Sequence, residues 1–333
     1  MEATAKRLMA PGKGVLAVDD FTPGITRRLA AIGVESTEAT RRDYREMLFT
    51  TTGAMRDYIS GVILYDETFH QQARSGTPLR EIIAATGALV GVKLDKGQKP
   101  LGSEQLTDGL DDLEQRLAAY KKLGASFGKW RAVLSISAEL PSTGCIKANA
   151  MALARYAEIC QAQGIVPIVE PDILMNGDHG IERCAEVTAA VLSEQFEQLR
   201  NVNLKAMILK PNMVTAGSDA PQQPGHKTVA EMTLEVLRAC VPVSVAGVAF
   251  LSGGQSSVDA TAHLHHMNAA GGLPWPLTFS YNRALQDDAL KSWGGKEANI
   301  PAAQAAFAKR AKMNSLAALG KWSRGFETAG LTP

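Results

Sequence analysis

The chain has few of the features that mark secreted or membrane proteins. Its 333 residues include four cysteines and no CxxC pair, and Cys160 and Cys184 lie in helix-like patterns. We therefore expect buried thiols in a reducing compartment. No apolar run approaches transmembrane length, and the first residues lack the apolar core of a signal peptide. The sequence predicts a cytoplasmic protein with no membrane partner.

An excess of charge of one sign is also missing, as is a compact set of metal ligands. Lysine and arginine total 35 against 34 acidic residues, so no nucleic-acid partner is expected. His263, His265 and His266 stand in a helical pattern in which only the first and last can share a face. Asp178 and His179 stand in a glycine-flanked stretch typical of a turn. We predict no catalytic metal and no cofactor.

What the chain does have is eight short apolar runs, and helical patterns between them. Such runs indicate parallel strands buried on both faces. A doubly wound open sheet is the alternative, but no GxGxxG motif follows the first run. We predict an α/β fold, a parallel (β/α)8 TIM barrel in a single domain over residues 1–333, with a short C-terminal extension from about residue 321. The runs are residues 14–19, 59–65, 88–95, 127–136, 165–171, 206–214, 242–251 and 277–281.

Charged residues recur where these apolar runs end. Lys210 ends one of them, and a lysine buried there must be paired or neutral unless its side chain reaches water. A neutral amine is the form that attacks a carbonyl to make a Schiff base. In a barrel the carboxyl ends of the strands meet at one mouth, so we expect one charged cluster, either catalytic or a structural ion-pair network. Its other members are Asp19, Lys93, Asp95, Lys129, Arg131, Glu170 and Asp172, in which the pairs 93/95, 129/131 and 170/172 share a face by the period of two.

A phosphate site is predicted at the last two strand ends. Ser252, Gly253 and Gly254 follow the seventh run and open a helix, so their backbone N–H groups can surround an anion. Arg283 follows the eighth run and supplies a planar cation suited to phosphate. These two loops hold phosphate in many such barrels. A simple tight turn is the alternative for the two glycines.

Ten stretches of the sequence match the pattern of a known family. They are residues 12–17, 61–64, 92–97, 129–131, 153–157, 164–171, 209–215 (Leu-Lys-Pro-Asn-Met-Val-Thr), 250–256 (Phe-Leu-Ser-Gly-Gly-Gln-Ser), 277–281 and 283–286. On these stretches the chain resembles the class I fructose-bisphosphate aldolases over nearly its whole length. The resemblance implies a reversible, metal-free cleavage of fructose 1,6-bisphosphate to dihydroxyacetone phosphate and glyceraldehyde 3-phosphate through a lysine Schiff base. It also implies a homo-oligomer, commonly a tetramer.

The resemblance also implies a role for each site residue. Lys210 would attack the substrate ketone, with Lys129 as a second cation beside it. Glu170 would transfer protons as general acid and base, and Asp19 would take the proton from the C4 hydroxyl. Ser252, Gly253, Gly254 and Arg283 would bind the phosphate on C1, while Lys93 and Arg131 would bind the phosphate on C6, with Arg28 as a further basic residue of the same mouth.

Two departures from the family pattern stand out. Relatives usually read Ala-Ala-Asp-Glu-Ser-Thr-Gly-Ser after the first strand, whereas residues 17–24 read Ala-Val-Asp-Asp-Phe-Thr-Pro-Gly. Phe21 and Gly24 thus replace two serines, and Asp20 replaces a glutamate. We expect Lys93 and Arg131 to carry more of the C6 phosphate binding, or the preference to shift toward fructose 1-phosphate or sedoheptulose bisphosphate.

The second departure is at the C-terminus, where many relatives carry a tail ending in a tyrosine. No tyrosine follows residue 281, so we expect another group or water to assist proton transfer at C3. Other function classes remain as alternatives, namely a transaldolase-type transferase and a non-catalytic aldolase-like scaffold. The intact charged cluster disfavours the scaffold, and the two phosphate sites disfavour the transferase.

Overall fold

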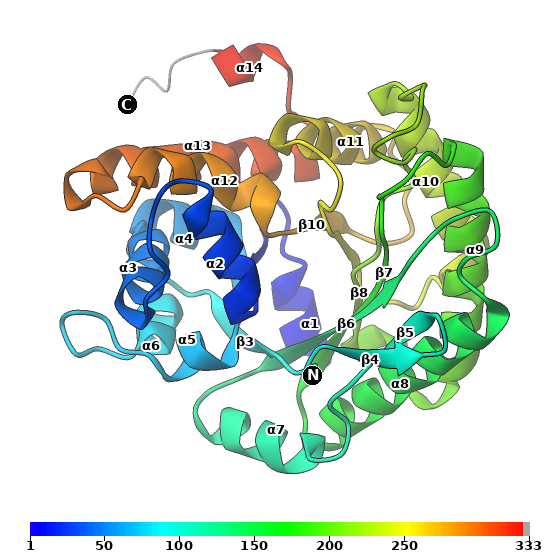
Figure 1. Cartoon of the computed structure of the whole chain (residues 1–333), viewed down its shortest axis with the longest axis horizontal. Helices are drawn as coiled ribbons and strands as arrows, with labels where there is room; N and C mark the ends of the chain where they lie inside the picture. Colours follow the sequence, from blue (N-terminus) through cyan, green and yellow to red (C-terminus); the bar gives the residue numbers. More distant parts are fainter. Residues whose placement is uncertain (329–333) are drawn as a thin grey trace.

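The computed structural model describes residues 1–328 and contains a closed barrel of eight parallel strands in the order β1-β10-β9-β8-β7-β6-β3-β2 (Figure 1). The predicted (β/α)8 architecture is therefore confirmed. The barrel strands are β1 (Gly14–Val18), β2 (Ile59–Leu64), β3 (Leu89–Lys93), β6 (Phe127–Leu134), β7 (Val166–Ile173), β8 (Ile208–Leu209), β9 (Val248–Phe250) and β10 (Leu277–Tyr281).

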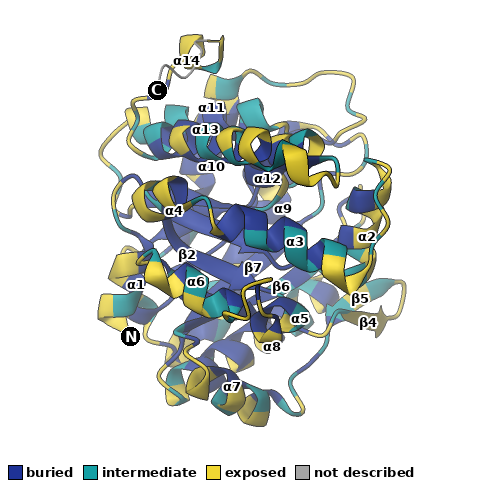
Figure 2. Cartoon of the chain, turned by 90° about the vertical axis from the view of Figure 1, so that its left-hand side faces the viewer, coloured by how far each residue is buried: buried dark blue, intermediate teal, exposed yellow. Residues whose placement is uncertain are grey.

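Helices surround the barrel, and their apolar faces bury the outer surface of the strands. Figure 2 shows the barrel strands in the buried colour and the surrounding helices with exposed residues on their outer sides. The helices are α1 (Glu2–Leu8), α2 (Thr22–Ala30), α3 (Glu38–Phe49), α4 (Thr52–Tyr58), α5 (Asp66–His70), α6 (Leu79–Ala85), α7 (Leu113–Lys122), α8 (Thr143–Ala162), α9 (Ile181–Gln198), α10 (His226–Cys240), α11 (Ser257–Ala269), α12 (Arg283–Trp293), α13 (Ile300–Ala318) and α14 (Gly325–Thr328), with 3-10 turns η1 (Leu199–Asn201), η2 (Leu204–Ala206) and η3 (Glu297–Asn299).

Strand alternation decides which side chains face the barrel axis. In β1, Val15 and Ala17 belong to the interior cluster, whereas Leu16 and Val18 pack with the helices. Because side chains alternate along a strand, the next residue, Asp19, continues the inward face. The same alternation holds in three other strands, where Phe127 of β6, Ile168 of β7 and Ile208 of β8 are interior residues. The inward face then continues to Lys129 and Arg131 on β6, to Glu170 and Asp172 on β7, and to Lys210 directly after β8.

Phe127 fills the barrel interior because two neighbouring strands have glycine beside it. A Cβ added at Gly91 would lie 2.3 Å from the Phe127 ring, and one added at Gly61 would lie 3.1 Å from the same ring and 2.6 Å from Leu8. Leu8 belongs to α1, so this short helix packs into the same interior cluster. Interior packing of this kind leaves the opposite end of the barrel for the charged residues.

The connections and one strand differ from the pattern of the sequence. Residues 98–107 form a largely exposed hairpin, β4 (Gln98–Leu101) and β5 (Glu104–Thr107), which no apolar run marks, and the next helix begins at Leu113. The sixth strand is limited to two residues, since Pro211 has no N–H to continue the ladder after the bond from Lys210 N–H to Val169 O (2.8 Å). The helices that were not predicted are α1, α2, α4, α5, α12 and α14.

Beyond α13 the chain turns back on the barrel's helical layer. Glu327 of α14 pairs with the buried Arg310 of α13 at 2.7 Å and accepts a hydrogen bond from Trp322 Nε1 at 3.0 Å. The predicted extension from about residue 321 begins here, and its last part, residues 329–333, lies outside the described residues. Among residues 1–328, no helix combines the length and apolar character needed to cross a membrane.

Candidate active site

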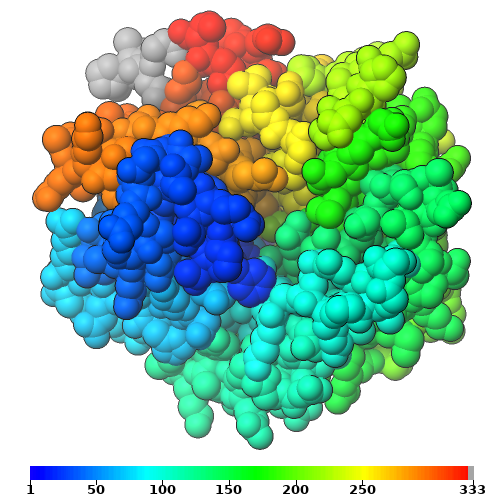
Figure 3. Space-filling view, viewed as in Figure 1, coloured from blue at the N-terminus to red at the C-terminus, as the bar shows by residue number. Residues whose placement is uncertain are grey.

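A cleft of about 770 Å³ opens at the carboxyl ends of the barrel strands. Its mouth lies near the centre of the face shown in Figure 3. Of the eleven residues predicted to form the site, the structure brings ten into the cleft wall, and Gly254 does not line it. The ten are Asp19, Arg28, Lys93, Lys129, Arg131, Glu170, Lys210, Ser252, Gly253 and Arg283.

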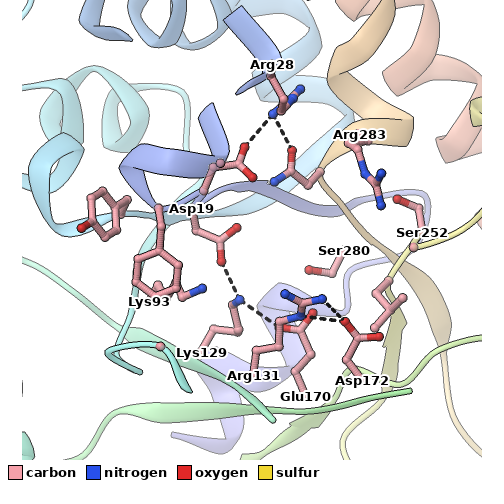
Figure 4. Close-up of a pocket in the computed structure, with 18 of the residues that line it drawn as sticks. Asp19, Arg28, Lys93, Lys129, Arg131, Glu170, Asp172, Ser252, Ser280 and Arg283 are labelled. Carbon is pink, nitrogen blue, oxygen red and sulfur yellow. Dashed lines mark hydrogen bonds and ion pairs between the residues drawn. The ribbon is translucent and has the colours of Figure 1, made fainter. Parts of the chain in front are cut away.

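Two lysines and two carboxylates form a buried cluster at the base of the cleft. Lys129 Nζ lies 2.6 Å from Asp19 Oδ2 and 2.9 Å from Glu170 Oε2 (Figure 4). The other oxygen of Glu170 lies 3.0 Å from Lys210 Nζ. Glu170 therefore bridges the two lysines, and each of the four side chains is buried. Opposite charges at these distances offset much of the cost of burying them.

The protonation states of this cluster follow from burial and charge acting in opposite directions. Burial alone raises the pKa of Asp19, but the positive charges of Lys129, Lys93 and Lys210 lower it below its usual range. Burial also raises the pKa of Glu170, and Lys129 and Lys210 again lower it overall. Burial lowers the pKa of Lys129, whereas Asp19 and Glu170 raise it well above its usual value. Both carboxylates are thus ionised and able to accept a proton.

The outer part of the cleft holds the remaining strand-end charges. Arg131 Nε donates to Asp172 Oδ2 at 2.6 Å, and Lys93 Nζ lies 3.5 Å from Asp95. Burial raises the pKa of Asp172 by more than Arg131 lowers it. Burial, with Lys129 nearby, lowers the pKa of Lys93. Each of the two cations predicted to bind the C6 phosphate is therefore paired with a carboxylate. Lys93 is paired with Asp95, two residues further along the chain, and Arg131 of β6 is paired with Asp172 of the neighbouring strand β7, although Asp95 itself does not line the cleft.

An aromatic pair borders the cleft beside Lys93. Lys93 Nζ stands 3.8 Å from the centroid of the Phe21 ring, which is a cation–π geometry. Phe21 in turn meets Tyr65 edge to face, with ring centroids 5.6 Å apart. Both rings line the cleft. At this position a phenyl ring contacts the lysine and offers no hydroxyl donor.

Arg28 lines the cleft, but its guanidinium is engaged by three partners. It lies 2.6 Å from Asp20 and 3.1 Å from Asp287, and it donates to Asn282 Oδ1 at 2.9 Å. Asp287 belongs to α12 and Arg28 to α2, so the arginine connects two helices at the rim.

The Gly-Gly loop lies between β9 and α11. Ser252 and Gly253 line the cleft, and the Arg283 side chain points toward Ser252 (Figure 4). Gly254 has a φ of +74°, and a Cβ added there would lie 2.5 Å from Met175. Glycine is needed at 254 for a left-handed turn and for close contact with the neighbouring loop. Its predicted contact with phosphate stays a prediction.

Sequence reasoning missed several residues of the cleft wall. Ser280, one residue before the end of β10, is buried there, and its Oγ has no hydrogen-bond partner among the described residues. Its signal in the sequence was a polar residue at a strand end. Asn282, Tyr65 and Arg27 also line the cleft. Within residues 1–328, no group of three or more histidine, cysteine, aspartate or glutamate side chains is arranged to hold a metal ion.

Proteins similar to this chain in sequence and in structure belong to one family. The family model for class-I fructose-bisphosphate aldolase matches residues 1–331. A probable fructose-bisphosphate aldolase class 1 of Xanthomonas campestris pv. campestris is 49% identical over 325 residues, covering 96% of this chain and 97% of the relative. Fructose-bisphosphate aldolase of Drosophila melanogaster is 49% identical over 332 residues, covering 98% and 92%.

A solved structure shows the same fold. Fructose-bisphosphate aldolase from Plasmodium falciparum, crystallised with TRAP and a small-molecule inhibitor, superposes with a TM-score of 0.95 at 43% identity, covering 97% of this chain and 94% of that one. The barrel fold and the buried lysine–carboxylate cluster are consistent with these matches. The chain belongs to the class I fructose-bisphosphate aldolase family, whose members are lyases that work through a Schiff base.

Proposed function

We propose that Lys210 is the Schiff-base nucleophile of this chain and that Glu170, Lys129 and Asp19 are its catalytic partners. We propose fructose 1,6-bisphosphate as the substrate, in agreement with the term fructose-bisphosphate in the names of the family and of the relatives. The observation that carries the assignment is the position of Glu170, 3.0 Å from Lys210 Nζ and 2.9 Å from Lys129 Nζ. One carboxylate can therefore exchange protons with the attacking amine while a fixed cation holds it in place.

The chemistry begins at the ketone carbon. Lys210 Nζ adds to C2, the former carbonyl oxygen gains a proton, and Glu170 moves protons between nitrogen and oxygen until water leaves. The resulting iminium withdraws electrons from the C3–C4 bond. Asp19 accepts the proton of the C4 hydroxyl as that bond breaks, the aldehyde departs, and the bonding electrons form an enamine at C3. Protonation of C3 and addition of water release dihydroxyacetone phosphate and restore Lys210.

We propose that the two ends of the cleft bind the two phosphates. Ser252 and Gly253 offer backbone N–H groups and Arg283 a guanidinium to the phosphate on C1. Lys93 and Arg131 face the C6 phosphate. Gly254 shapes the loop, and Arg28 acts at the rim through its carboxylate partners.

The names of the relatives favour fructose bisphosphate over a monophosphate or a longer sugar as the main substrate. By resemblance we also propose a cytoplasmic homotetramer.

Borohydride trapping tests the Schiff base. The protein is incubated with dihydroxyacetone phosphate, with and without prior chelation, then reduced and mapped by peptide mass spectrometry. We expect a reduced adduct on Lys210 that chelation does not change. Lys210→Met should abolish the adduct and lower kcat on the order of 10³-fold or more.

The matched control is Lys205→Met, which alters an exposed lysine of η2 and should leave both measurements unchanged. Cleavage that chelation abolishes, together with no adduct on Lys210, would show that the proposed mechanism is wrong for this chain.

A further inference from the structure

A buried histidine outside the cleft contacts the end of the Gly-Gly loop. His263 lies on α11 and is 5% exposed. Its Nδ1 is 2.7 Å from Oε1 of Gln255, the residue that follows Gly254. An amide oxygen only accepts hydrogen bonds, so Nδ1 carries the proton and donates. Within the described residues, His263 is the one hydrogen-bond partner of the Gln255 side chain.

The His263 ring is fixed in turn by groups on α10 and α11. The ring of His226, the first residue of α10, packs edge to face on it, with centroids 5.0 Å apart. His226 Nε2 lies 2.8 Å from Asp259 Oδ1. The other oxygen of Asp259 accepts from Ser256 Oγ at 2.6 Å, and Ser256 Oγ accepts from Asp259 N–H at 3.1 Å. Gln255 and Ser256, the two residues after the loop glycines, are therefore both bonded to this group of side chains.

The loop is a tight turn that depends on how its last residue is held. Gln255 N–H donates to Ser252 O at 3.2 Å and closes the turn. Gly254 adds a left-handed conformation and contact with Met175, but no side chain of its own. The hydrogen bond from His263 restrains the Gln255 side chain and so supports the closed turn. A closed turn keeps Ser252 and Gly253 in the cleft wall, where backbone N–H groups of such a loop can bind an anion.

We propose that His263 is a positioning residue for phosphate binding, acting through the Gln255 side chain on the Ser252–Gly254 loop. This inference rests on the proposed function, since it assigns the loop to the phosphate on C1. His263 touches neither the substrate nor the reacting atoms. Its loss relaxes the turn, so phosphate binding weakens while the Lys210 chemistry is retained.

The test compares His263→Leu with His263→Asn. Leucine removes the donor and keeps apolar volume, whereas the asparagine amide keeps a donor near the place of Nδ1. For His263→Leu we expect KM for fructose 1,6-bisphosphate and Ki for inorganic phosphate to rise roughly three- to tenfold, with kcat within about twofold, because one hydrogen bond that preorganises the site is lost. His263→Asn should restore both constants to within about twofold. His265→Leu is the matched control, because that ring packs on Trp322 and not on the loop.

Borohydride trapping separates a positioning role from a general structural one. With His263→Leu, adduct formation on Lys210 should require more dihydroxyacetone phosphate but the same concentration of dihydroxyacetone, which has no phosphate. If trapping with both compounds weakens equally, or if kcat falls while KM and Ki stay constant, the proposal is overturned. Unchanged KM and Ki in a folded His263→Leu variant would overturn it too.

A second variant covers the case in which His263→Leu does not fold. Gln255→Ala removes the same hydrogen bond from the loop side and should raise Ki for inorganic phosphate to a similar extent, and no rise would overturn the proposal. Failure of the proposed function is recognised separately. If wild type forms no adduct on Lys210, the increase in Tm caused by inorganic phosphate still tests the loop, and it should be smaller in Gln255→Ala than in wild type.

Discussion

Lys93 reaches the cleft across the face of Phe21. This contact changes how the end of the cleft proposed for the C6 phosphate can bind it. A serine at position 21 would offer a neutral hydroxyl, whereas the phenyl ring offers no donor and instead orients the ammonium 3.8 Å from its centroid. Burial lowers the pKa of Lys93, and a ring face that attracts cations favours the charged form. Binding at this end therefore depends on charge more than on hydroxyl groups.

Replacing Phe21 tests that dependence. Phe21→Leu keeps apolar bulk but removes the aromatic face, at a cost of about 0.5–2 kcal/mol in cation–π attraction. We expect KM for fructose 1,6-bisphosphate to rise roughly two- to tenfold, since Lys93 is then less well placed. KM for fructose 1-phosphate, which has no C6 phosphate, should stay unchanged, and Phe21→Tyr should behave as wild type. Equal increases in KM for both sugars would contradict the proposed role of Phe21.

At the scale of whole elements, α2 and α12 are joined across the rim by Arg28. Two carboxylates, Asp20 and Asp287, surround the one guanidinium of Arg28, so this group of three side chains carries a net negative charge. Asp287→Ala should remove one negative charge and lower KM for fructose 1,6-bisphosphate roughly twofold to threefold, with a smaller effect at high salt because Asp287 is partly exposed.

Steady-state kinetics at two salt concentrations measure this effect, and the neighbouring Asp288 supplies the control. Asp288 is exposed and forms no ion pair in the described structure, so Asp288→Ala should change KM less than Asp287→Ala. A KM for Asp287→Ala that is unchanged or higher would mean that Asp287 supports Arg28 in binding instead of competing with the phosphate for it.

The barrel strands could be predicted from the sequence, while some connecting elements could not. Apolar runs mark buried strands, and the period of two placed Lys129 beside Arg131 and Glu170 beside Asp172 on one face. The hairpin at 98–107 is largely exposed and has no apolar pattern to mark it. The partners of Arg28 could not be predicted either, because Asn282 and Asp287 are 254 and 259 residues away in the chain.

At the scale of the whole molecule, buried ionisable groups set how stability depends on pH. The pKa values of Asp19 and Glu170 are lowered on folding, so the stability they contribute is present at neutral pH and is lost as pH falls below the ordinary range of carboxylates. The stability that His263 contributes is also lost as pH falls, but over a higher pH range. Burial first, and then His226 and His266, lower its pKa from 6.5 to about 4, while Asp259 opposes them.

The sign of the His263 effect follows from proton binding. Between pH 6.5 and about 4 the unfolded chain binds a proton at this position and the folded chain does not, so stability is complete above pH 6.5 and falls as pH drops toward 4. By pH 5 the loss amounts to about 2 kcal/mol, since each pH unit corresponds to about 1.4 kcal/mol.

Urea denaturation at pH 7.5 and pH 5.0 measures this loss. We expect wild type to lose about 2 kcal/mol more free energy of unfolding over this interval than His263→Asn, which cannot titrate there. The other histidines and the carboxylates are common to both proteins, so the difference isolates His263. An equal loss in the two proteins would show that His263 titrates alike in the folded and unfolded chains. The ring would then be accessible to water, which is incompatible with a buried imidazole held between His226 and Gln255.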